Sequence, residues 1–167
     1  MKGFIINKKI KYNYILLDLH NFVKWIQENK KIRKSIEKII SIHRDQVNFK
    51  IINLIYEAFE DIENNKNTYY FFIYKNNEII TSCRLIIDNK KNAYMNMTHT
   101  NIKYRNLGFC KRNKSKFISL MKDKCKKIIL DVDKKNKNAI KCNISSGFIF
   151  SKINKKSNNY KMIFYYK

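Results

Sequence analysis

The chain has 167 residues, of which 44% are hydrophobic and 14% aromatic, so we expect one domain with a packed core. Its formal net charge of +23 would ordinarily indicate a nucleic-acid or anionic-membrane partner. The apolar run at residues 4–6 is too short for a signal peptide or a membrane span, which favours a cytoplasmic location, in a cell or a host, without a membrane partner.

The composition of the basic residues argues against a nucleic-acid surface. Only five of the 36 basic residues are arginine, and the lysines are spread through every segment. Arginine would dominate a surface that reads bases or grips phosphates. Lysine, asparagine and isoleucine are the residues of AT-rich codons, so we attribute most of the charge to an AT-rich genome and keep nucleic-acid binding as the less favoured alternative.

The four cysteines show no C-x-x-C pair and no accompanying histidine spacing. This argues against zinc and against a disulfide framework. We therefore expect free thiols in a reducing compartment and no metal, with Cys110 and Cys142 as small buried residues rather than nucleophiles.

The predicted elements alternate between strands and helices. A strand at 12–18 is followed by helical periodicity over 20–64, in which Val47 belongs to the cleanest amphipathic stripe. Aromatic and β-branched residues predict strands at 69–75 and 78–87, joined by a tight turn at Asn76-Asn77 that accepts positive φ. A third strand follows at 93–102.

The second half of the chain continues this alternation. The predicted elements are a helix at 111–124, a strand at 127–132, a helix at 136–145, and a final strand pair at 148–153 and 160–166. No repeat or linker divides the chain. The pattern predicts a single α/β domain of the α+β kind, with a mixed, mostly antiparallel twisted sheet of about six to seven strands flanked by helices.

Glycine is scarce, with three in the chain and no proline, so each surviving glycine indicates a backbone requirement. Gly108 lies between a predicted strand and a predicted helix, where a short loop turns its N–H groups towards a helix N-terminus. Such a loop binds phosphate, with residues 106–111 as donors. The basic Lys111 and Arg112 oppose the helix dipole there, so their placement favours a bound anion. Gly147-Phe148 predicts a helix C-cap followed by a core aromatic residue.

The two glycines lie in motifs that resemble those of the GNAT superfamily of acyl-CoA-dependent N-acetyltransferases. That family carries (Arg/Gln)-x-x-Gly-x-(Gly/Ala), preceded by tyrosine, and residues 104–110 read Tyr-Arg-Asn-Leu-Gly-Phe-Cys. Its second motif is similar to the stretch from Asn136 through Ala139 and Ile140 to Gly147-Phe148. The resemblance runs from about residue 12 to 167. It implies one N-acetyltransferase-like domain over 1–167, with an acceptor-side helical region at about 20–64, a cofactor-binding core at about 68–148 and a strand pair at 148–166.

The resemblance also implies a co-substrate, acetyl-CoA, and the residues that bind it. The loop would hold the pyrophosphate, the end of the strand before it would pair with the pantetheine arm, and an asparagine would contact the cofactor from the next helix. By strict alternation, His99 faces away from its neighbours unless a bulge reverses it, and it is more readily a packed strand residue than a base. The implied cofactor-binding residues are Thr98, His99, Thr100, Arg105, Asn106, Leu107, Gly108, Phe109, Cys110, Lys111 and Asn136.

The implied catalytic residues depart from the family pattern. The frequent acid in the family is a tyrosine seven residues after the motif asparagine, where this chain has Asn143, an amide that cannot donate a proton in that way. Members that acetylate protein N-termini place an acidic residue on the preceding strand, where Asp131 stands, one methylene shorter than the usual glutamate. Asp131 is thus a candidate base, although a solvent-facing residue paired with a lysine explains it as well.

We therefore expect an N-acetyltransferase that transfers acetyl from acetyl-CoA directly to a primary amine of a protein or a small molecule, as a monomer or homodimer. The alternatives are a basic nucleic-acid-binding protein and a non-catalytic CoA-binding protein, both derived from the same fold.

Overall fold

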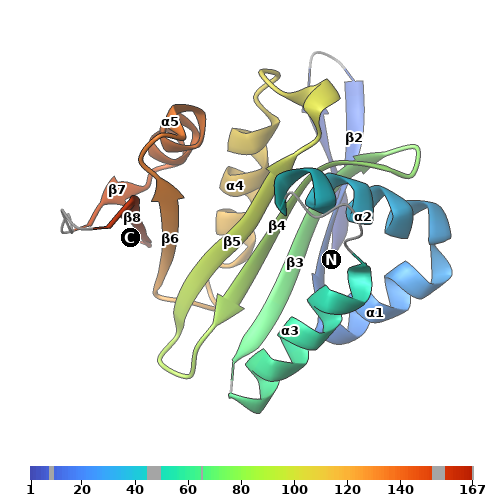
Figure 1. Cartoon of the computed structure of the whole chain (residues 1–167), viewed down its shortest axis with the longest axis horizontal. Coiled ribbons are helices and arrows are strands. Elements are labelled where there is room, and N and C mark those ends of the chain that lie inside the picture. Colours follow the sequence, from blue (N-terminus) through green and yellow to red (C-terminus); the bar gives the residue numbers. More distant parts are fainter. Residues whose placement is uncertain (8–9, 45–49, 65, 152–156, 167) are drawn as a thin grey trace.

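The computed structural model describes residues 1–7, 10–44, 50–64, 66–151 and 157–166 (Figure 1). Its centre is an eight-stranded sheet in the order β1-β2-β3-β4-β5-β6-β8-β7. Neighbouring strands are antiparallel except β5 and β6, which are parallel. This confirms the predicted mixed, mostly antiparallel sheet. The strands are β1 (Lys2–Asn7), β2 (Ile10–Asp18), β3 (Asn67–Lys75), β4 (Glu78–Ile87), β5 (Asn92–Thr100), β6 (Lys127–Asp133), β7 (Ile149–Phe150) and β8 (Asn159–Tyr165).

Helices cover both faces of the sheet. The first three lie on one face and α4 lies on the other, while α5 lies beside β6 (Figure 1). The helical periodicity predicted over 20–64 divides into three helices, and its residue Val47 lies outside the described residues. The helices are α1 (Leu19–Glu28), α2 (Lys30–Arg44), α3 (Ile51–Glu63), α4 (Phe109–Leu120) and α5 (Lys137–Ser145), with a 3₁₀ turn at Ile102–Tyr104.

Each face of the sheet has its own hydrophobic core. On the α4 side, Phe71 and Phe117 stack with ring centroids 5.2 Å apart. On the α1–α3 side, Phe22 stacks on Tyr70 at 4.1 Å. Because alternate residues of β3 enter opposite cores, this strand is buried on both faces, as its continuous aromatic run indicates.

The turn and cap predictions are confirmed. Asn76 and Asn77 have φ of 48° and 62° and join β3 to β4 as a tight hairpin. Gly147 has φ of 91° after α5, and its N–H donates to the carbonyl of Ile144 at 3.0 Å. Phe148 is 2% exposed in the core on the α4 side.

The strand β1 was not predicted, because its apolar run is short and its partner strand begins only three residues later. Gly3 pairs with Tyr14 of β2, and a Cβ on Gly3 would lie 2.4 Å from the tyrosine ring. A larger residue could not take this place without moving the ring. At the other end of the chain, the strand predicted at 148–153 is the two-residue β7, and positions 152–153 lie outside the described residues.

Candidate active site

The sheet opens between β5 and β6. The two strands pair only through Asn92–Tyr94 and Lys127–Ile129, after which they diverge (Figure 1). Each strand keeps its pairing on the other side, β5 with β4 and β6 with β8. The second halves of β5 and β6 therefore form the two sides of an opening in the centre of the sheet.

A β-bulge sets the direction of the side chains at the end of β5. Met97 has φ of 52°, and the register with β4 shifts between Ser82 and Arg84. The bulge precedes residues 98–100 and shifts all three together, so their mutual alternation is kept and His99 is not reversed. Thr98 and Thr100 then both line the cleft beside the opening, whereas His99, between them, does not.

The loop before α4 turns its backbone towards the same cleft. Asn106 and Gly108 have φ of 60° and 78°, and Gly108 is the N-cap of the helix. Within the described part of the chain, no side chain caps this N-terminus and no acidic residue lies in its first turn. Lys111 and Arg112 lie in that turn instead. Lys111 lines the cleft, whereas Arg112 Nη1 donates to the carbonyl of Leu107 at 3.2 Å. The first N–H groups of the helix and the Lys111 cation thus lie at a place suited to an anion.

The cleft has a volume of about 640 Å³ and brings together most of the predicted cofactor residues. Two of them do not line it: His99, which follows the bulge, and Leu107, which packs against the core on the α4 side. The predicted residues that line the cleft are Thr98, Thr100, Arg105, Asn106, Gly108, Phe109, Cys110, Lys111 and Asn136.

Asn136 has a structural role at the cleft as well. It is the N-cap of α5, and its Oδ1 accepts a hydrogen bond from the N–H of Ala139 at 3.1 Å. The capping bond uses the side-chain oxygen and leaves the NH₂ group available as a donor for a ligand.

The other residues that line the cleft were not predicted as site residues. Those on α5 follow helical spacing after the N-cap, and this periodicity is the signal that could have identified them. Tyr104 donates its hydroxyl to Glu78 Oε2 at 2.9 Å, and burial together with this contact raises its pKa to about 12. The added lining residues are Tyr104, Asn138, Ala139, Lys141, Cys142 and Ser145.

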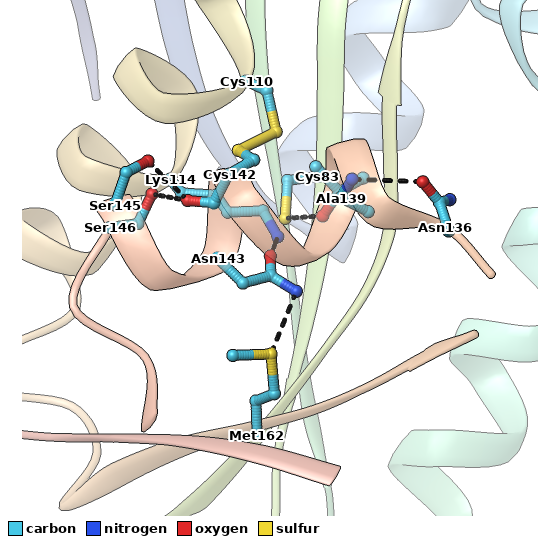
Figure 2. Close-up of a disulfide and its surroundings, with 11 residues drawn as sticks. Cys83, Cys110, Lys114, Asn136, Ala139, Cys142, Asn143, Ser145, Ser146 and Met162 are labelled. Carbon is cyan, nitrogen blue, oxygen red and sulfur yellow. Dashed lines mark hydrogen bonds between the residues drawn. A yellow bond between two sulfur atoms is a disulfide. The ribbon is translucent and has the colours of Figure 1, made fainter. Parts of the chain in front are cut away.

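The prediction of free thiols is wrong for two of the four cysteines. Cys110 of α4 and Cys142 of α5 form a disulfide across 32 residues, with their Cα atoms 6.4 Å apart (Figure 2). Both residues are half-buried and line the cleft. The sequence carried no signal for this pair, because the fold, rather than a spacing motif, brings the two helices together. Cys83 and Cys125 are free and buried, as expected.

Asn143, at the position of the family's usual acid, points away from the cleft. It is 1% exposed, its Nδ2 lies 3.6 Å from Met162 Sδ, and its Oδ1 accepts a hydrogen bond from Lys114 Nζ (Figure 2). The lysine is 4% exposed and extends from α4 under the disulfide. Asn143 therefore holds a buried ammonium group and does not reach a substrate in the cleft.

Burial shifts the pKa values of two neighbouring groups in this core, Lys114 and Cys83. Burial of Lys114 lowers its pKa to about 8, and the nearby Cys83 partly opposes that shift. Burial raises the pKa of the Cys83 thiol to about 11, against the opposing effects of its contact with Thr98 and of Lys114. Cys83 Sγ lies 3.3 Å from the Thr98 hydroxyl, which connects this buried pair to a residue of the cleft.

Asp131 lies on the other side of the opening. It is exposed on β6, two residues beyond the last pair with β5, and is opposite Lys161 of β8. Its neighbours Leu130 and Val132 enter the core on the α4 side, so the alternation of the strand turns Asp131 to the opposite face. It is not among the residues that line the cleft.

No group of three or more histidine, cysteine, aspartate or glutamate side chains in the described ranges could hold a metal ion. None of the helices in that part of the chain combines the length and apolar character needed to cross a membrane.

Comparison with known proteins decides the family. A model of the acetyltransferase (GNAT) family matches residues 36–148, more than half of the chain. The chain belongs to the GNAT acetyltransferase family. The match includes the motif at Gly108 and ends at Phe148, so it spans both motifs recognised in the sequence. No curated protein matches this GNAT chain significantly in sequence.

Solved GNAT structures share the fold at low sequence identity. The GNAT domain of PAT from S. lividans has a TM-score of 0.72 at 8% identity, covering 99% of this chain and 97% of its own. A chain of the NatC complex bound to Gag peptide and CoA has a TM-score of 0.65 at 20% identity, covering 92% and 98%. An acetyl-CoA-bound GNAT acetyltransferase from Elizabethkingia anophelis has a TM-score of 0.55 at 15% identity, covering 68% and 82%.

Proposed function

We propose that this GNAT protein transfers an acetyl group from acetyl-CoA directly to a primary amine. The observation that carries the proposal is the cleft at the N-terminus of α4, where the start of the helix and the basic residues Arg105 and Lys111 line a space of about 640 Å³. Two structural neighbours bind CoA or acetyl-CoA, which supports the same co-substrate here. A diphosphate is the part of acetyl-CoA that this N-terminus suits.

The extended cofactor follows the residues of the cleft in order. Its pyrophosphate lies against residues 106–111, where Gly108 lets the backbone approach closely. Its pantetheine arm runs along the end of β5 at Thr98 and Thr100, beyond the last pair with β6. Asn136 donates its NH₂ group from the N-cap of α5. The thioester then reaches the opening in the sheet.

Transfer requires a neutral amine. Its nitrogen attacks the thioester carbonyl to form a tetrahedral intermediate, which collapses to the amide and releases the CoA thiolate. The amine loses one proton in this sequence, and we assign its acceptance to Asp131 on the face opposite α4, directly or through water. The ternary complex forms no covalent enzyme intermediate.

The acceptor approaches from the face that carries α1–α3. Specificity for the acceptor would come from these helices and the final strands. Their sequences contain no motif that identifies a particular amine. A protein amino group is one candidate, since a structural neighbour binds a peptide together with CoA. Small-molecule amines are the other.

A CoA-binding protein without turnover is the second candidate function. The burial of Asn143, where the family places a tyrosine, favours it, because no acid then reaches the leaving thiolate from that position. The CoA thiolate must leave unaided or take its proton from water for the enzyme proposal to hold.

A release assay separates the two candidates. The protein is incubated with acetyl-CoA and a panel of peptides with free N-termini, polyamines, amino sugars and aminoglycosides, and CoA thiol is measured against amine-free controls. We expect thiol release with at least one amine, and Asp131→Asn should lower kcat by roughly 10²-fold or more, within the range for a general base. Asp133→Asn, two residues along the same face of β6, is the matched control. Saturable acetyl-CoA binding without release in any sample would contradict an enzyme and support the CoA-binding protein.

A further inference from the structure

The disulfide between Cys110 and Cys142 joins the two helices that flank the cofactor cleft (Figure 2). Cys110 lies in the first turn of α4, directly in the loop assigned to the pyrophosphate, and Cys142 lies on the face of α5 that lines the cleft. Both sulfurs therefore belong to the wall of the cleft. The other two cysteines are buried and belong to no disulfide, so they are separate from this pair.

We propose that Cys110 and Cys142 form a redox-active pair whose state is linked to acetyl-CoA binding. The inference rests on the proposed function, because it takes the ligand of the cleft to be acetyl-CoA. The disulfide form is the tighter binder. A low-molecular-weight disulfide such as oxidised glutathione is the oxidant, and the corresponding thiol is the reductant.

The surroundings of Cys110 favour its reaction as a thiolate. It lies two residues after the N-cap Gly108, where helix N–H groups point outward, and Lys111 follows it. Helix N-termini and adjacent cations stabilise thiolates. Its side chain is half-buried and lines an open cleft, so a small disulfide can reach it.

The exchange proceeds in two balanced steps. The Cys110 thiolate attacks one sulfur of the small disulfide, forming a mixed disulfide and releasing one thiolate. Cys142 then loses its proton to solvent, and its thiolate attacks Cys110 Sγ, which forms the protein disulfide and releases the second thiolate. Two electrons pass from the protein pair to the oxidant, which becomes two thiols after protonation.

The disulfide affects acetyl-CoA binding because it fixes the position of α5 relative to α4. Residues of the cleft come from α4 and its loop on one side and from α5 on the other, including Asn136. Besides the disulfide, the buried Lys114–Asn143 hydrogen bond joins these helices in the interior (Figure 2). Reduction removes the covalent link between the two walls and lets their cleft-side residues move more relative to each other, and a ligand must then order them on binding. Oxidation removes that requirement.

Thermodynamic linkage supplies two independent measurements of one coupling. If oxidation raises the affinity for acetyl-CoA by some factor, acetyl-CoA must favour the disulfide in a thiol/disulfide buffer by the same factor. We expect this factor to be about 5- to 10-fold, at the lower end of ordinary coupling between sites.

The test uses the whole chain. Affinity for acetyl-CoA is measured by calorimetry on protein equilibrated with oxidised glutathione or with a reductant, and the disulfide is verified by mass spectrometry of unreduced peptides. The oxidised fraction is then titrated over glutathione ratios with and without saturating acetyl-CoA. Cys142→Ser should bind with the affinity of the reduced protein in either buffer, while Cys125→Ser, the matched control, should keep the difference.

The outcomes distinguish this inference from the proposed function. Tighter binding by the oxidised protein and an equal shift of the glutathione midpoint support the link. A pair that stays reduced at every ratio, or equal affinities within twofold with an unshifted midpoint, contradicts the link and leaves the proposed function intact. Absence of acetyl-CoA binding in both states contradicts both the proposed function and the link. Mass spectrometry still shows in that case whether the disulfide forms.

Discussion

At the scale of single residues, Lys114 shows the strongest conflict between burial and charge. Its ammonium group lies in the core on the α4 side, held by Asn143 Oδ1 and above the ring of Phe148, with its Nζ 5.7 Å from the ring centroid. Asn143 thus has a structural reason to be an amide in this chain. Its carbonyl oxygen satisfies a buried donor, which a phenol ring at the same place could not do in the same way.

We predict that Lys114 makes stability depend on pH. Its pKa is about 8 when folded, against 10.5 for an unperturbed lysine, so between these values the unfolded chain binds a proton that the folded chain does not. The free energy of unfolding therefore rises with pH in this window, by about 3 kcal/mol in all. Urea denaturation at half-unit pH steps from 7 to 10.5 measures the rise.

The matched variant isolates this contribution. Lys114→Met keeps a long side chain and removes the titrating group, so the difference in unfolding free energy between the two proteins should change with pH by that amount. Both proteins carry Cys83→Ser in this comparison, because the raised pKa of Cys83 has the opposite sign, removes stability above about pH 9 and itself depends on Lys114. A difference that stays constant across the pH range would contradict the buried ammonium.

At the scale of elements, an ion-pair cluster holds α3 to the sheet. Arg84 of β4 is 4% exposed and donates to Glu57 Oε2 at 2.6 Å and Asp61 Oδ2 at 2.5 Å, both on α3. Thr68 of β3 donates to the same Asp61 oxygen at 3.0 Å. Three elements thus meet at one carboxylate on the face assigned to the acceptor.

We predict that Arg84→Met destabilises the protein by roughly 3 kcal/mol, because it leaves Asp61 largely buried without its cation. The double variant Arg84→Met/Asp61→Asn should recover more than half of that loss, since it removes the unpaired charge. Both are measured by urea denaturation at pH 7. Equal destabilisation in the single and double variants would contradict the role of the charge.

The elements that the sequence predicted are those whose signal is local. The hairpin at Asn76-Asn77, the C-cap at Gly147 and the loop at Gly108 each follow from residues that accept positive φ. The edge strand β1 was missed, because six residues carry too weak a periodicity. The α5 residues of the cleft share one helical face, which periodicity could have identified once Asn136 was placed. The Cys110–Cys142 disulfide depends on how two helices pack, and no pattern along the chain encodes that distance.

At the scale of the whole molecule, the formal net charge is +23, and the acidic residues are unevenly distributed along the chain. The helix α3 carries four of the 13 acidic residues and no basic residue, while the loop and first turn of α4 carry cations at the cleft. Positive charge at the cleft steers an anionic cofactor towards it.

We predict that this charge does not amount to nucleic-acid recognition. At physiological salt, binding to duplex and single-stranded oligonucleotides should be weaker than micromolar and should not discriminate between sequences. Fluorescence anisotropy across 50–300 mM salt measures it, with free lysine-rich peptide of equal charge as the control. Submicromolar affinity at 150 mM salt would favour the nucleic-acid alternative.

The central claim is that the N-terminus of α4 binds the pyrophosphate of acetyl-CoA. Gly108 has φ of 78°, so any side chain there is strained, and Gly108→Glu adds a negative charge beside the phosphates. Gly108→Ala carries the same strain without the charge and is the matched control, with circular dichroism to verify folding. Calorimetry should give one acetyl-CoA per chain for the natural protein, weaker binding for Gly108→Ala and none for Gly108→Glu. No binding by the natural protein at millimolar acetyl-CoA, or undiminished binding by Gly108→Glu, would contradict the claim.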